Sequence, residues 1–172
     1  MTDLDSGFAY SVAGIKKESL LLNVAIVGAG QTSYGVHDES SVDELVFEAV
    51  STALDDAGLE REEIESVVTA GSDALDGRSI SNMLTAGAAG AYLKDEVKVS
   101  DGGIYGLVMG YLRVASGLFR NSLIVSWTKS SETSPAKVGN LSFEPFYSRY
   151  IVFNHITSLA LEASLYIYKS NI

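Results

Sequence analysis

The sequence predicts an α/β fold, and three observations support this prediction. Short apolar runs rich in β-branched residues alternate with longer segments of helical periodicity, an order typical of parallel sheets. The 172 residues are 47% hydrophobic and 20% charged, so the chain can bury a core of its own. It contains no cysteine, so that core must hold together without disulfides or Cys-ligated metals.

The first predicted strand follows an N-terminal arm. Residues 1–21 fit no periodic pattern, which leaves 22–172 as the predicted domain. Leu22–Val27 is a short apolar run and predicts a strand buried on both faces. Gly28 and Gly30 come next, but Ser33 stands where a dinucleotide-binding fingerprint needs its third glycine. We therefore interpret the glycine pair as a tight turn that leaves the strand.

The next segment carries the clearest helix signal. Ser41 and Glu44 have the spacing of a capping box, and apolar positions keep helical spacing as far as Gly58. A helical turn over 59–64 and a strand over 64–70 follow. The predicted order is therefore strand, helix, strand.

The second part of the chain repeats this alternation. Further helices are predicted over 79–91, 104–118 and 155–168, strands over 97–99 and 123–127, and a loop region over 128–150. Four glycines line one side of the 104–118 helix or its approach: Gly102, Gly103, Gly106 and Gly110. A glycine inside a helix costs up to ~1 kcal/mol relative to alanine, so we expect close backbone contact there.

Composition argues against several function classes. The chain has 12 basic and 22 acidic residues and a net charge of -10, so no nucleic-acid partner is expected. Its 2 histidines are far apart, at His37 and His155, so no metal site is expected. No apolar run approaches the ~18 residues of a membrane span, and the acidic N-terminus does not suit a secretory signal. We expect a cytoplasmic protein.

The strongest candidate site is the turn Ser100-Asp101-Gly102-Gly103, between a short strand and a long helix. Such a turn places side chains at a helix N-terminus, where free N–H groups and the macrodipole favour negative charge. Asp101 fits a functional carboxylate. It also fits a structural N-cap, so both interpretations stay open.

Several segments in order resemble the N-terminal half of thiolases, in particular the bacterial and archaeal enzymes similar to sterol-carrier-protein-linked thiolases. The resemblance covers about residues 22–170 and rests on an ordered set of segments: 23–32, 56–59, 67–68, 97–127, 143–146 and 160–168. It implies one half of a five-layered α-β-α-β-α fold, with a mixed, mostly parallel sheet covered by helices on both faces. It also implies dimers or tetramers that transfer acyl groups between coenzyme A thioesters.

The resemblance breaks at the nucleophile. The family pattern resembles Val-Glu-x-Ala-Cys-Ala-Ser-Gly; Val97 matches its first residue, and Asp101 occupies the position of the catalytic Cys. The family's acid–base His and second Cys lie in a C-terminal half that these residues do not include. Ordinary acyl-cysteine catalysis is therefore excluded for this chain.

Three hypotheses follow from the resemblance. The first is a catalytically degenerate subunit that forms a homo-oligomer, or a hetero-oligomer with a thiolase-type chain, and binds acyl-CoA or lipid. The second is a Cys-independent enzyme of acyl-CoA carbon–carbon bonds (retro-aldol or acyl transfer), completed by a partner chain. The third is a truncated product without a role.

A coenzyme A thioester is the implied substrate or ligand, with no covalently bound cofactor. Its implied contacts are Gly102, Gly103, Tyr147 and Arg149, although a loop or interface role also explains the last two.

Overall fold

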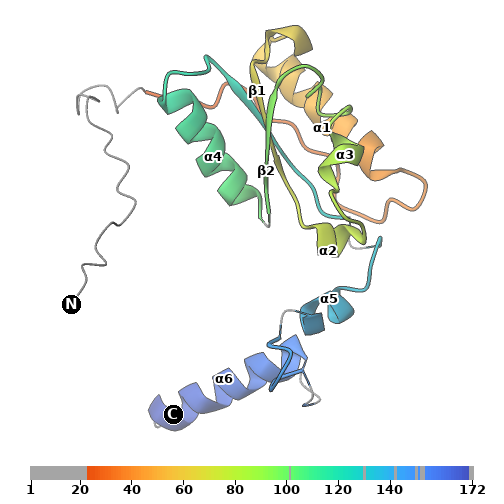
Figure 1. Ribbon diagram of the computed structural model, residues 1–172, viewed down its shortest axis with the longest axis vertical. Helices are drawn as coiled ribbons and strands as arrows, with labels where there is room; N and C mark the ends of the chain where they lie inside the picture. Colours follow the sequence, from red (N-terminus) through yellow and green to blue (C-terminus); the bar gives the residue numbers. More distant parts are fainter. Residues whose placement is uncertain are drawn as a thin grey trace, which may run out of the picture.

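The computed structural model describes residues 23–100, 102–129, 131–141, 143–149, 151 and 154–170 (Figure 1). The predicted arm over 1–21 and the boundary that follows it lie outside these residues. So does Asp101.

A parallel three-stranded sheet forms the centre of the fold (Figure 1). Its order is β2 (Asp95–Val99), β1 (Ser66–Ala70), β3 (Ser122–Ser126). Every residue of β1 is buried, because β1 has a strand on each side and helices above and below. The sequence predicted all three of these strands. Four of the six predicted strand ends differ from the observed ones, by one or two residues.

Helix α1 (Val42–Ala57) covers one face of the sheet. The capping box is present: the Ser41 hydroxyl accepts from the backbone of Glu44, and the Glu44 carboxylate accepts from the backbone N–H of Ser41 at 2.8 Å. Gly58 ends the helix in the left-handed conformation, with φ of 64°. A 3-10 turn (Arg61–Glu63) then leads into β1. These elements confirm the predictions.

Helix α4 (Gly103–Ala115) covers the opposite face and packs on β1 and β3 (Figure 1). Its glycines permit this packing. A Cβ on Gly106 would lie 2.9 Å from the Cβ of Ala70, and one on Gly110 would lie 2.5 Å from the side chain of Ile124. The expected close contact therefore exists, and it is made with side chains of the sheet.

Two predicted segments differ in the structure. The helix predicted over 79–91 is reduced to α3 (Asn82–Thr85), followed by turns, and a separate short helix α2 (Asp73–Asp76) precedes it. The small residues over 86–90 supply few side chains to hold a helix, and Gly90 adopts a φ of 70°. The loop predicted over 128–150 contains α5 (Pro135–Leu141). The last predicted helix is confirmed as α6 (His155–Ser170), and its side chains are almost all exposed.

The prediction of a first strand over 22–27 is wrong for the described residues of that range, because they form no strand. Residues 23–30 belong to no sheet of the described chain, because no strand pairs with them. Their path is nevertheless extended. A Cβ on Gly28 would meet Ala53 and Ala57, whereas one on Gly30 would meet Ala49 and Ala53. The step from Gly28 to Gly30 therefore advances along α1 by about one helical turn, ~5.4 Å. Two residues of an extended strand rise by a similar distance.

We expect Gly106→Ala to destabilise the protein by about 1–2 kcal/mol, because overpacking against Ala70 outweighs the gain in helix propensity. Gly87→Ala is the matched control, since nothing lies within 4 Å of its would-be Cβ. Urea unfolding measures both. Equal stability of the two variants would show that α4 does not depend on this contact.

Candidate functional site at the carboxyl ends of the strands

The three parallel strands end at one edge of the sheet, at Ala70, Val99 and Ser126. The loops that follow them therefore meet there. In α/β sheets, ligands bind in the crevice outside these carboxyl ends. This edge is the candidate functional site.

The amino end of α4 lies at this edge. Gly102 is the N-cap residue, with φ of -70° and ψ of 153°, and no side chain caps the helix among the described residues. Asp101, which precedes Gly102, lies outside the described residues, so its two interpretations stay predictions. Gly103 needs its lack of a side chain, because a Cβ would lie 2.9 Å from the Ser126 side chain. Beside Gly102, no described residue apart from its chain neighbours lies within 4 Å of a would-be Cβ.

A tryptophan locks two of the loops together. The indole Nε1 of Trp127 donates to Oδ2 of Asp76 at 2.9 Å, and Asp76 is only 4% exposed. A Cβ on Gly71 would lie 2.7 Å from the indole ring, so the glycine makes room for it. The loop after β3 is thus fixed against the loop after β1.

An ionic network ties β2 to the segment after β1. Lys98 donates to Asp73 and, at 2.8 Å, to the hydroxyl of Ser81. Asp73 also accepts from the backbone N–H groups of Ile80 and Ser81, at 3.1 Å and 2.9 Å. The Lys98 ammonium, followed by the Ser81 donors, holds the pKa of Asp73 well below its ordinary value. With its donors and acceptors paired in this way, the network is structural.

A second ion pair steadies the loop after β3. Lys129 donates to the carbonyl of Ser40 at 2.8 Å and lies 3.0 Å from Glu132, which also pairs with Arg78 at 3.2 Å. The hydrogen bond from Lys129 lowers the pKa of Glu132. These contacts tie Lys129 and Glu132 into the loop predicted over 128–150.

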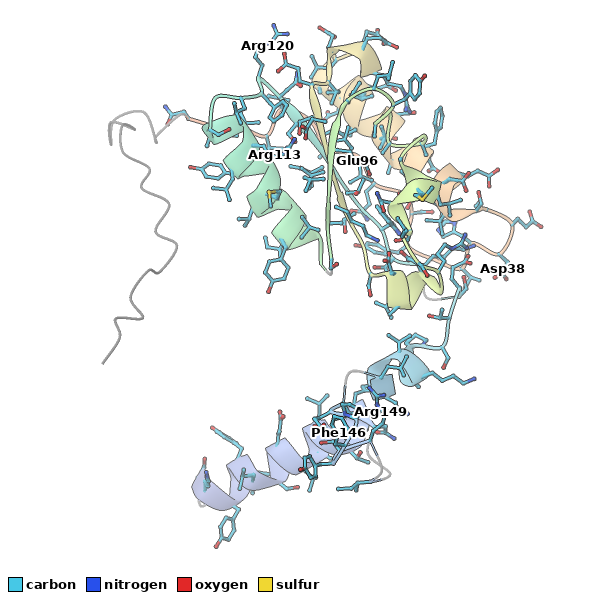
Figure 2. The ribbon with its side chains drawn as sticks, in the orientation of Figure 1. Asp38, Glu96, Arg113, Arg120, Phe146 and Arg149 are labelled. Atoms are coloured by element: carbon cyan, nitrogen blue, oxygen red, sulfur yellow. The ribbon has the colours of Figure 1, made fainter. Side chains whose placement is uncertain are left out.

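The structure places the four predicted ligand contacts in two separate regions. Gly102 and Gly103 lie at the strand ends. Arg149 lies with α5 and α6, beyond α2 from the sheet (Figure 2). Tyr147 precedes it by two residues in the same segment between α5 and α6. Arg149 donates to the carbonyls of Leu141 and Phe143, at 2.8 Å and 3.2 Å, so it braces its own loop, and Tyr147 is 81% exposed.

Sequence reasoning did not find Asp73, Asp76 or Lys98. One signal was available for the two aspartates: they follow a predicted strand at its carboxyl end, where polar side chains of α/β proteins gather. Lys98 stands between Val97 and Val99 in a short predicted strand, where a charged residue that becomes buried needs a partner. Nothing in the sequence indicates which partner it takes.

Within the described ranges, no group of three or more His, Cys, Asp or Glu side chains is placed to hold a metal ion. None of the helices described there is long and apolar enough to cross a membrane.

The parallel sheet with helices on both faces matches a thiolase-like fold. Among solved structures, the crystal structure of 3-oxoacyl-[acyl-carrier-protein] synthase III from Aquifex aeolicus VF5 is similar, with a TM-score of 0.51 and 21% identity. The match covers 60% of this chain and 35% of the synthase chain. No family model and no curated protein matches the sequence. The predicted thiolase-like fold is confirmed.

Acid denaturation tests the ionic network. Because the folded-state pKa of Asp73 is lowered, its contribution to stability is present above the unfolded pKa, near 4, and is lost as the pH falls through the folded value. We expect Asp73→Asn to lower stability at pH 7 and to flatten the loss of stability below pH ~4.

Asp38→Asn is the control, because it also removes one negative charge but lies in the exposed loop before α1, outside the network. Urea midpoints measured from pH 7 down to pH ~2 compare the two variants. Parallel curves for Asp73→Asn and the wild type would show that the network adds nothing to stability.

Proposed function

We propose that this protein is a thiolase-like subunit that binds acyl-CoA thioesters together with a partner chain and forms no acyl-cysteine of its own. One observation carries the proposal: a chain with a thiolase-like fold contains no cysteine, and Asp101 stands where the resemblance places the nucleophile.

The chemistry of that position favours a degenerate site. The field at a helix N-terminus lowers the pKa of a thiol and makes it a better nucleophile. The same field keeps an aspartate ionised. A carboxylate that attacked a thioester would form a mixed anhydride, which a thioester has little tendency to do at neutral pH.

Two observations support a partner. The match spans 35% of the synthase chain, so the described sheet corresponds to a minor part of a larger thiolase-like fold. Large apolar side chains are exposed on α4 and α6, among them Ile104, Tyr105, Leu159 and Tyr168. Exposed apolar surface of this extent marks interaction sites. The partner is a second copy or a thiolase-type chain, and the sequence segments resemble those of the sterol-carrier-protein-linked group.

The helix field at position 101 can be tested by introducing the missing thiol. We expect the thiol in Asp101→Cys to have a lower pKa, and to react a few-fold faster with iodoacetamide near neutral pH, than the thiol in Ser116→Cys. Ser116 is the exposed C-cap of the same helix, where the dipole has the opposite sign. The parent chain has no cysteine, so each variant carries a single reactive thiol. Equal rates would contradict the proposed placement of residue 101.

Calorimetric titration with acetoacetyl-CoA tests the function itself. We expect saturable binding that free acetate does not displace, and no thiolysis by this chain alone. Absence of binding to the chain, alone and with a purified thiolase-type partner, would overturn the proposal. Thiolysis that disappears in Asp101→Ala would instead establish the Cys-independent acyl-CoA enzyme, in which Asp101 acts as base.

A further inference from the structure

An apolar groove lies at the amino ends of the strands, at the opposite end of the sheet from the candidate site. The turns that precede β1, β2 and β3 meet there, because parallel strands begin at one edge. Figure 2 shows Arg120, in the turn before β3, at this end of the sheet, away from α2. The groove has a volume of about 640 Å³, and its apolar lining is Ile64, Tyr92, Leu93, Leu118 and Phe119. We call it the amino-edge groove.

Three large apolar side chains of this lining are exposed. Tyr92, Leu93 and Leu118 are 81%, 88% and 77% exposed, and they come from two different turns. Exposed apolar side chains gathered around a groove mark an interaction site. The backbone of Leu93 has a φ of 58°, a left-handed conformation that suits glycine and is unfavourable for leucine. The chain therefore keeps an exposed leucine where a glycine would fit with less strain.

The rim of the amino-edge groove is acidic. From Asp55 to Glu65 the sequence holds 6 acidic residues and 1 basic residue, Arg61. The guanidinium of Arg61 donates to the carbonyl of Ala88 at 3.0 Å, outside the groove lining. The charged residues that line the groove are Glu62, Glu65, Asp95 and Lys94. Three carboxylates thus accompany one ammonium.

The cations beside the groove are held by partners within the chain. Lys94 donates to the backbone carbonyl of Arg61. Arg120 pairs with Glu65 at 2.5 Å. In the part of the chain that the structure describes, no hydrogen bond or salt bridge engages the exposed carboxylate of Glu62. Negative charge therefore remains for a partner to pair with.

The end of α1 also carries charge against local preference. Asp55 is exposed in the last turn of this helix, which contains no basic residue. The macrodipole disfavours negative charge at a helix carboxyl end. Because the 3-10 turn leads directly from this helix end into β1, Asp55 extends the acidic rim. Local preferences are commonly broken where a surface has a function.

We propose that the amino-edge groove binds a basic polypeptide segment of another protein, which carries arginine or lysine beside large apolar side chains. Its apolar side chains cover Tyr92, Leu93 and Leu118, and its cations pair with the acidic rim. A second copy fits less well, because each chain has a net charge of -10 and brings the same acidic rim. The groove and the proposed acyl-CoA site lie at opposite ends of the strands, so this inference goes beyond the proposed function.

A labelled peptide tests the groove on the full chain. The probe is a short fluorescein-labelled peptide in which arginine alternates with leucine. We expect saturable binding by fluorescence anisotropy that weakens as salt is added, because salt screens exposed charges. One matched peptide has serine in place of leucine, and another has glutamate in place of arginine. Both should bind about tenfold more weakly, because leucine burial and charge pairing each contribute.

Leu93→Gly removes an anchor of the groove and leaves the fold intact, because glycine accepts the left-handed backbone. We expect this variant to bind the arginine–leucine peptide about tenfold more weakly. Ile80→Gly is the matched control. Ile80 is also exposed (56%) and also has a positive φ, of 56°, but it lies between α2 and α3, outside the groove. Its replacement should leave binding unchanged.

A second pair of variants tests the acidic rim. Glu62→Lys reverses a charge in the groove lining and should weaken binding a few-fold at low salt. Glu39→Lys makes the same reversal in the exposed loop before α1, outside the groove, and should change binding little.

Contrary results overturn the proposal in distinguishable ways. Absence of saturable binding rejects the groove as a site. Equal effects of Leu93→Gly and Ile80→Gly, or of Glu62→Lys and Glu39→Lys, reject it as well, because binding is then general attraction to an acidic chain. Equal binding of the glutamate–leucine peptide rejects a basic partner. A mass by light scattering that rises with concentration without peptide, but not in Leu93→Gly, makes a second copy the occupant. Acetoacetyl-CoA binding is measured separately, so either proposal can fail without the other.

Discussion

The close approach of α4 to the sheet is the contact on which the rest of the structure depends. Gly106 and Gly110 bring the helix backbone onto the side chains of Ala70 and Ile124. Gly103 does the same at the first turn, against Ser126. This packing fixes the height and direction of the helix over β1 and β3. The position of its amino end follows from these three contacts.

Side chains at the amino ends of the strands hold the sheet in register. Asn121 accepts from the backbone of Glu65 and donates to the carbonyl of Glu63, both at 2.9 Å, as an additional strand residue would. Arg113 reaches from α4 to Ser66 at 2.6 Å and also pairs with Asp95, so it connects helix, β1 and β2. The amino edge is thus braced by side chains, as the carboxyl edge is by the Trp127–Asp76 and Lys98–Asp73 contacts.

Local signals in the sequence predicted most of this core. The capping box at Ser41 and the apolar spacing of α1 determine that helix almost without help from the rest of the chain, and the alternation of segments identifies β1 and β3. The segment around 23–27 misled the prediction, because an apolar β-branched run becomes a strand only when another strand pairs with it. The helix predicted over 79–91 failed for a related reason: small residues permit a helix but contribute little to hold one.

The site was less predictable than the fold. Gly102 and Gly103 could be placed from the glycine pattern before α4. The Asp73–Lys98 pair and the Trp127–Asp76 hydrogen bond join residues 25 and 51 positions apart, and no local pattern encodes such pairings. Tyr147 and Arg149 came from family resemblance alone, which carries no information about the path of this loop.

The placement of Trp127 has a practical consequence. It is the only tryptophan in the chain, and it is half-buried between Gly71 and the Asp76 carboxylate, directly at the carboxyl edge of the sheet. Indole emission depends on the polarity and hydrogen bonding around the ring. The protein therefore carries an intrinsic fluorophore at its candidate site, and rearrangement of the strand-end loops can be followed optically without a label.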